Sequence, residues 1–148
     1  MTLVKREWIG HEFPPARAQL DRPRLRAFAK AVGEDESLYL DVDAARRAGY
    51  RDLPALPTYL FCLEMLDAAN PFNFLEDLGV DITRILHGEQ DFHYHSPVCA
   101  GDCVVFRSRV TDVYEKKGGT LGFIVQETSV TREDGQPVAT LKRVIVVR

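Results

Sequence analysis

The feature that most constrains the fold is a change in the hydrophobic period along the chain. Up to about residue 70, apolar residues recur every three or four positions, which is typical of helices. From about residue 83 onwards they alternate with polar residues, which is typical of strands. Four strands are predicted, at roughly 84–95, 103–115, 120–131 and 138–147. The glycine-containing connections 117–119 and 133–135 predict antiparallel hairpins.

Three helices are predicted before these strands. The first begins at Asp21, a good N-cap residue, tolerates Pro23 in its first turn and ends at Gly33. A short helix is expected over 41–48. The third, from residue 57 to about residue 69, is apolar on nearly all sides and is therefore expected to be buried. A buried helix followed by a long meander predicts an α+β fold, with an antiparallel sheet wrapped around a central helix.

Length and composition set the class of protein. The chain of 148 residues is expected to form a single domain, 1–148, with an ordinary apolar content of 45%. A net charge of −3 gives no reason to expect nucleic acid or a membrane surface as a partner. Charges begin within the first seven residues and no long apolar run follows, so neither a signal peptide nor a membrane span is predicted. Three cysteines without metal-type spacing, Cys62, Cys99 and Cys103, indicate reduced thiols and a cytoplasmic location.

The histidines of the first predicted strand are candidates for chemistry. His87, His93 and His95 share parity, so they are expected to face the same side. A His-x-His pair begins some metal sites, but residues 96–100 supply no carboxylate to complete one. A polar or interface position is the favoured interpretation for His93 and His95, and no metal or cofactor is predicted.

Two other segments contain candidate functional groups. The acids 34–36, between the first two helices, are either caps in a solvated loop or functional carboxylates. The buried helix opens at Pro57, Thr58 and Tyr59, where N–H groups lack helical partners and lie at the positive end of the dipole. Such groups stabilise negative charge on a carbonyl oxygen. The sequence does not separate this role from that of an ordinary helix start.

Taken together, these segments resemble the MaoC-like or FAS1-like dehydratase family, in its N-terminal or small-subunit branch. The resemblance covers nearly the whole chain. Its pieces are 28–33, 41–52, 55–59, 86–92, 96–97, 100–102 and 110–113. It implies a hot-dog fold, acyl thioesters of coenzyme A or acyl carrier protein as ligands, and hydro-lyase chemistry as an (R)-specific enoyl-thioester hydratase or 3-hydroxyacyl-thioester dehydratase.

The active branch of that family carries the motif Gly-Asp-x-Asn-Pro-x-His, whose Asp and His perform the chemistry. On this chain the Gly falls on Gly33, the Asp on Glu34 and the His on Tyr39. A phenol titrates at about 10 and an imidazole at about 6.5, so Tyr39 is a poor replacement. The chain is therefore similar to the non-catalytic subunits of mycolic-acid dehydratases, in which one protein holds the acyl chain and a partner supplies the Asp/His pair.

Two alternatives remain open. A homodimer acts alone as a hydratase or thioesterase, using Glu34 or Asp35 with His87, or the chain is a non-enzymatic acyl-CoA-binding module. Dimerisation, with itself or with a catalytic MaoC-like subunit, is expected in each case, because a hot-dog sheet has an exposed edge. The candidate substrate-binding residues are Asp35, Arg51, Pro57, Thr58 and Tyr59. Arg51 meets phosphates or an acidic carrier in this interpretation, or is a solvated charge.

Overall fold

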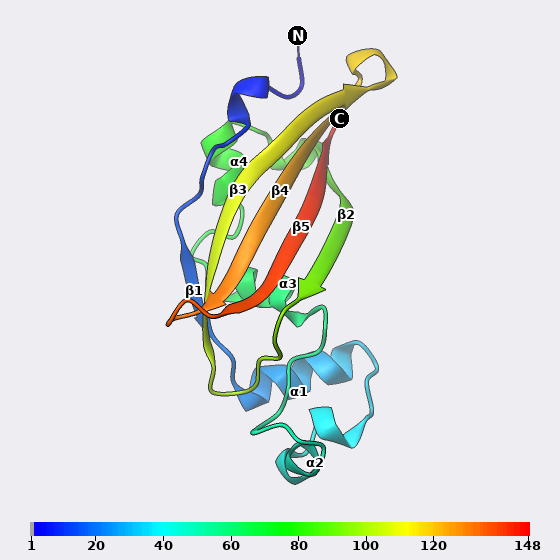
Figure 1. The fold of residues 1–148 in the computed structure, drawn as a ribbon. Helices are drawn as coiled ribbons and strands as arrows, with labels where there is room; N and C mark the ends of the chain where they lie inside the picture. Colours follow the sequence, from blue (N-terminus) through cyan, green and yellow to red (C-terminus); the bar gives the residue numbers. More distant parts are fainter. Residues whose placement is uncertain (1) are drawn as a thin grey trace.

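A computed structural model describes residues 2–148 of the chain. The helices and strands are arranged as Figure 1 shows. The α-helices are α1 (Arg22–Ala31), α2 (Val42–Arg47), α3 (Tyr59–Leu66) and α4 (Asn73–Leu78), and the strands are β1 (Ala16–Gln19), β2 (Ile85–Tyr94), β3 (Cys103–Lys116), β4 (Leu121–Arg132) and β5 (Pro137–Val147). Short 3-10 turns, among them η2 (Ser37–Tyr39), connect them. In residues 2–148 no helix has the length and apolar character needed to cross a membrane.

The strands form one antiparallel sheet in the order β1-β3-β4-β5-β2. The four predicted strands are confirmed to within a residue or so, because each is long enough to show its alternation. The predicted hairpin turns are also confirmed, and Gly118 and Gly135 have φ of 63° and 89°, which favours glycine. Strand β1 has no signature in the sequence, since four residues are too few to show a period.

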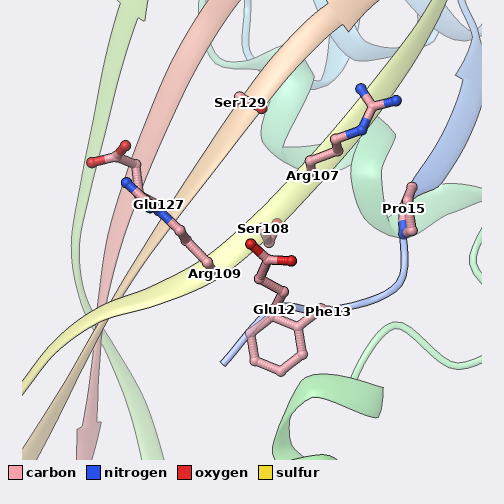
Figure 2. A pocket seen from close by; sticks show the side chains of 8 residues that line it. All are labelled: Glu12, Phe13, Pro15, Arg107, Ser108, Arg109, Glu127 and Ser129. Carbon is pink, nitrogen blue, oxygen red and sulfur yellow. The ribbon is translucent and has the colours of Figure 1, made fainter. Parts of the chain in front are cut away.

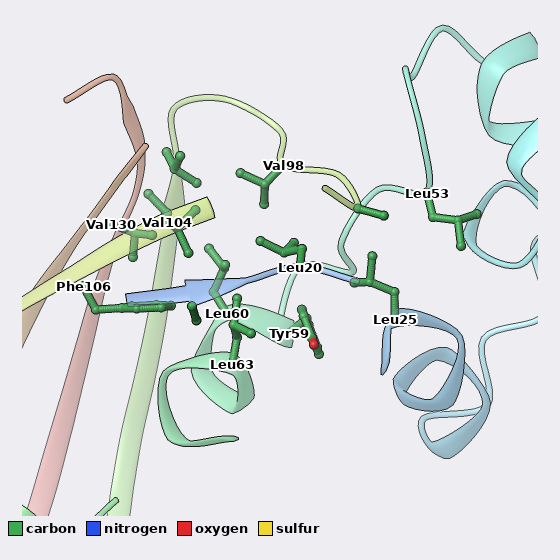
Figure 3. Packing of buried hydrophobic residues seen from close by; sticks show 14 of the residues in the cluster. Leu20, Leu25, Leu53, Tyr59, Leu60, Leu63, Val98, Val104, Phe106 and Val130 are labelled. Atoms are coloured by element: carbon green, nitrogen blue, oxygen red, sulfur yellow. The ribbon is translucent and has the colours of Figure 1, made fainter. Parts of the chain in front are cut away.

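Helix α3 packs against one face of the sheet and forms the centre of the core (Figures 1 and 3). Leu60 and Leu63 are fully buried, and they cluster with side chains of β3 and β4 such as Phe106. This confirms the α+β prediction. The predicted extent of the helix, 57–69, is too long, and Leu66 is 54% exposed, so the helix is not buried on all sides. Beyond Leu66 the sequence Asp-Ala-Ala-Asn offers little apolar surface to hold another turn against the sheet.

Helices α1 and α2 lie together at one end of the sheet, near the C-terminal end of β2 (Figure 1). Both begin at the predicted caps. The Asp21 carboxylate accepts a hydrogen bond from the Arg24 N–H at 2.9 Å, and the Asp41 carboxylate accepts one from the Ala44 N–H at 3.0 Å. The loop between the helices, which carries the motif positions, therefore ends at the capped start of α2.

A β-bulge divides β2 and overturns one prediction. The pairing of β2 with β5 shifts register between His87 and Glu89, at Gly88. A Cβ at Gly88 would lie 2.9 Å from Cγ2 of Val146 and 3.2 Å from the Val144 carbonyl oxygen, so the close approach requires glycine. His87 consequently faces α3, with its ring 5.1 Å from that of Phe61, whereas His93 lies opposite Thr140 on the other side. The three histidines do not share a face, because the extra residue reverses the parity.

Candidate functional site

A pocket of about 400 Å³ opens between η2, the connection that precedes α3 and the segment that follows β2. Its wall is mainly aromatic and apolar, with phenol and imidazole groups as its polar members, a composition suited to a small organic ligand. The lining residues are Tyr39, Tyr50, Pro54, Ala55, Pro57, Tyr94, His95, Ser96, Pro97 and Val98. Two of the predicted site residues, Tyr39 and Pro57, thus meet in one cavity.

The two motif positions that hold Glu34 and Tyr39 lie close together. Burial raises the pKa of the Tyr39 phenol, and the neighbouring Tyr50 and the carboxylates of Glu34 and Glu36 raise it further. Glu34 itself is half-buried, and its Oε1 accepts a hydrogen bond from the Glu36 N–H at 3.0 Å. Asp35 is exposed. Tyr39 is therefore a neutral hydrogen-bond donor near pH 7 and not a group that exchanges protons readily.

The start of α3 is only partly available to a ligand. The Tyr59 N–H donates to the Leu56 carbonyl at 3.0 Å. The Tyr59 side chain is 1% exposed and packs against Phe28, with 5.2 Å between ring centroids. Burial raises the pKa of its phenol. Tyr59 is thus a core residue, while Pro57 reaches the pocket and Thr58 is exposed between them.

Three aromatic residues of the pocket are absent from the sequence-predicted site. Tyr50 and Tyr94 contribute rings, and burial raises the pKa of Tyr94 to about 12. His95 lies just beyond the end of β2, and its Nε2 is 3.1 Å from Thr140 Oγ1. His95 thus brings an imidazole to the pocket that Tyr39 also lines. The Tyr94-His95-Ser96-Pro97 turn brings the end of the strand to the pocket, and no local pattern in the sequence signals this.

His87 lies elsewhere in the chain. Its Nε2 is 3.0 Å from the Glu89 carbonyl, and its ring lines a separate small cavity beside Phe61. At about 3.3 Å per residue, the seven residues from His87 to Tyr94 separate it from the pocket by roughly 23 Å along β2. Within one chain, His87 is therefore not brought to Glu34 or Asp35.

Arg51 is held by a buried carboxylate. Asp102 is 7% exposed, and it accepts hydrogen bonds from Arg51, from Arg132 Nη1 at 2.8 Å and from the Cys99 N–H at 2.9 Å. Burial opposes ionisation of Asp102, but these donors outweigh it and lower its pKa. The Arg51 side chain remains 58% exposed, so part of its guanidinium still faces solvent. The network ties the connection before α3 to the start of β3 and the end of β4.

A larger hollow, of about 490 Å³, lies along β3 (Figure 2). Arg109 pairs in register with Glu127, and the neighbouring Arg107 pairs with Ser129. Glu12, Phe13 and Pro15 of the N-terminal segment form its other side. The charged groups of this hollow have both signs and come from adjacent strand positions, as on an ordinary solvated sheet face. None of the sequence-predicted site residues lines the hollow. Residues 2–148 also contain no cluster of three His, Cys, Asp or Glu side chains placed to bind a metal ion.

Comparison with known proteins decides the family. The sequence matches the FAS1-like dehydratase domain region over residues 7–141. The chain belongs to this family. Among its relatives, a UPF0336 protein of Saccharopolyspora erythraea is 36% identical over 150 residues, which cover 98% of this chain and 92% of that protein. A UPF0336 protein of Thermobifida fusca is 32% identical over 146 residues, covering 98% and 94%.

Solved structures of MaoC-like dehydratases share the fold. A C-terminally truncated HadBC complex, a 3R-hydroxyacyl-ACP dehydratase of Mycobacterium tuberculosis, contains a chain with a TM-score of 0.82 and 26% identity, covering 97% of this chain and 99% of that chain. The ChsH1–ChsH2 complex of the same organism gives a TM-score of 0.73 at 21% identity, with 92% and 88% covered. An (R)-hydratase of A. caviae involved in PHA biosynthesis gives 0.71 at 19%, with 95% and 96% covered. The predicted hot-dog fold is confirmed, and the first two of these structures are complexes.

Proposed function

We propose that this chain is one subunit of an (R)-specific enoyl-thioester hydratase or 3-hydroxyacyl-thioester dehydratase. It binds the acyl thioester, and a second hot-dog subunit supplies the Asp/His dyad. The observation that carries the proposal is the pocket of Tyr39, Pro57 and His95, in which the motif position of the His holds a phenol of raised pKa, while the motif position of the Asp holds Glu34 close by. A neutral phenol does not take up a proton near pH 7.

The chemistry divides between the two subunits. Hydration of a 2-enoyl thioester needs a base that takes a proton from water as its oxygen attacks Cβ, and an acid that gives a proton to Cα. In the proposal both groups come from the partner. Negative charge gathers on the thioester oxygen as the bond to Cβ forms, and an N–H at the start of α3 stabilises it. Since the Tyr59 N–H is already engaged by Leu56, this role falls to Thr58.

The free edge of β2 supports a paired subunit. Strand β2 is the last strand of the sheet and pairs only with β5. Leu86 and Tyr94, near its two ends, are 50% and 38% exposed. A ten-residue edge with exposed apolar side chains is a surface that proteins normally cover. A second hot-dog sheet joined at this edge covers it, and the complexes among the structural relatives are consistent with such pairing.

The test measures crotonyl-CoA hydration by the purified chain alone, by a hot-dog protein encoded nearby that carries Gly-Asp-x-Asn-Pro-x-His, and by the two together. We expect hydration that depends on mixing, and its loss when the partner's motif His is replaced by Ala. The matched control on this chain is Arg109→Met, on the solvated sheet face, which leaves the mixed activity unchanged.

The open alternatives give different results. Strong hydration or thioester hydrolysis by the chain alone, lost in Glu34→Gln and His87→Ala, favours the self-sufficient homodimer and contradicts the subunit proposal. Acyl-CoA binding without turnover in any mixture favours the binding module. Within one chain His87 lies away from the pocket. A self-sufficient homodimer must therefore supply His87 from its second copy.

A further inference from the structure

A row of polar side chains crosses the face of the sheet that packs against α3. Along this row, the register pairs Gln90 of β2 with Arg143 of β5, and Arg143 with Gln126 of β4. One step further along the sheet, Thr128 of β4 pairs with Ser108 of β3, and Ser108 Oγ donates to Glu64 of α3 at 3.1 Å. These positions alternate with the apolar residues that form the core, where polar groups are disfavoured.

Arg143 is the charged member of this polar row, and a charge is the most costly group to bury. The residue is 8% exposed, and burial lowers its pKa. Its Nε donates to Gln126 Oε1 at 2.9 Å, and its guanidinium carbon lies 4.2 Å from the centroid of the Phe74 ring. Within residues 2–148, the terminal nitrogens of Arg143 have no hydrogen-bond acceptor and no carboxylate within 4.0 Å. The buried Oε1 of Gln90, its neighbour in register, also lacks a partner.

Two cavities meet at Arg143. The first, of about 240 Å³, is bordered by α3, the N-terminal segment around Phe13 and the start of α4, and both Arg143 and Glu64 line it. The second, of about 110 Å³, lies on the β2 side and is almost wholly apolar. Its lining residues are Phe61, Met65, Phe72, Phe74, Ile85, Leu86, His87, Arg143 and Ile145. The second cavity therefore runs from the exposed edge strand, at Leu86, inwards to the guanidinium.

The charge at this point favours an anion. An arginine side chain stays protonated in proteins. Burial raises the pKa of Glu64, whose charge is opposed by desolvation although Arg143 and Ser108 favour it. The cavity thus presents a largely buried cation beside an acid whose pKa burial raises. A guanidinium with both terminal nitrogens unpaired matches a carboxylate, which accepts two parallel hydrogen bonds.

We propose that this subunit selects acyl thioesters that carry a carboxylate at the end distal to the thioester. The methylene chain lies against the apolar side chains between Phe61 and Ile145, and the distal carboxylate accepts hydrogen bonds from Arg143. The inference rests on the proposed binding of acyl thioesters and names their class. It explains why a charged arginine occupies a position in the core, where an apolar side chain would pack at lower cost.

The experiment compares two matched series of ligands by calorimetric titration of the complex and of the chain alone. One series is decanoyl-, dodecanoyl- and tetradecanoyl-CoA, and the other is the mono-CoA thioesters of the straight-chain dicarboxylic acids with the same numbers of carbons. These lengths are needed because the five residues from Gln90, which pairs with Arg143, to His95 of the pocket span roughly 16 Å along β2. At the preferred length we expect the dicarboxylic thioester to bind at least tenfold more tightly than its monocarboxylic match. Arg143→Met brings that ratio to about one, and Arg143→Lys, which lacks the planar fork, leaves an intermediate ratio.

Further variants distinguish a loss of binding from a loss of folding. Glu64→Gln replaces the carboxyl group with an amide of the same shape. We expect it to increase the affinity for dicarboxylic thioesters and to leave the affinity for their monocarboxylic matches unchanged. Arg109→Met, on the solvated face, leaves both series unchanged. Equal affinities for the two series in the wild-type protein, or an Arg143→Met protein that keeps the ratio, overturn the inference. Binding of dodecanoyl-CoA in that case still supports the proposed function. If no thioester of either series binds, both fail.

Discussion

Asp102 offers the sharpest test of how the candidate site is held in place. Its carboxylate joins Arg51, in the connection before α3, to Arg132 at the end of β4 and to the Cys99 N–H. The Arg51 side chain is 58% exposed, so that pair contributes only about 0.5 kcal/mol to the free energy of unfolding. Arg132 is 23% exposed and the Cys99 N–H is buried, so each of their hydrogen bonds to a charged acceptor contributes about 1–1.5 kcal/mol.

Asp102→Asn keeps one oxygen but removes the charge, and we expect it to lower the free energy of unfolding by about 2 kcal/mol. Asp102→Ala leaves the N–H and the guanidinium without an acceptor, and we expect a loss of about 3–4 kcal/mol. Urea unfolding followed by circular dichroism measures both, provided that the slope with urea is unchanged. An Asp102→Asn protein within 0.5 kcal/mol of the wild type would refute the reasoning.

The dependence on pH gives a second test of Asp102. Its pKa is lowered in the folded protein, relative to about 3.9 in an unfolded chain. Its contribution is therefore complete above about pH 4 and is lost as the pH falls through the folded-state pKa. The difference in unfolding free energy between the wild type and Asp102→Asn should stay constant from pH 7 to about pH 5 and narrow at lower pH. A difference that grows on acidification contradicts the assignment.

Three other substitutions probe the core, the bulge and the free edge. Leu63→Ala, at a fully buried position, should lower the free energy of unfolding by about 3 kcal/mol in urea, whereas a cost below 1 kcal/mol would contradict its place in the core. Gly88→Ala forces a Cβ against Val146 and the Val144 carbonyl and should cost about 1–3 kcal/mol in the same assay, and a neutral result would argue against the bulge. Leu86→Asp places a charge on the edge of β2 and should shift the elution of the complex towards separate subunits in gel filtration, with retained association counting against pairing at that edge.

The sequence predicts the elements with strong local signals and misses features that depend on packing. The long strands are found because alternation repeats over ten or more residues, and α1 and α2 are found because Asp21 and Asp41 cap them. The bulge at Gly88 is missed because a single extra residue leaves no trace in a period of two. Its consequence is the wrong expectation that His87 shares a face with His93.

The sequence predicts the part of the candidate site that the family motif and the helix start cover. Tyr39 and Pro57 line the pocket, as their positions in the motif and at the helix start suggest. Tyr59 was expected to contact substrate, but its ring is in the core, because the direction of one side chain around a helix start is set by tertiary packing. His95 reaches the pocket only through the return of the chain after β2, and no local pattern encodes that return. The assignment of catalytic and binding roles stays a prediction.

The bulge in β2 also restricts the proposed pairing of two subunits at this edge. A neighbouring strand that adds to the free edge of β2 finds an unbroken ladder only from Glu89 to Tyr94, since the backbone spacing changes at Gly88. An added strand that slides by one residue places the irregularity opposite a different position and loses hydrogen bonds there. In the proposed pairing, the bulge at Gly88 therefore fixes the register, and two subunits joined at this edge pair in one offset instead of several.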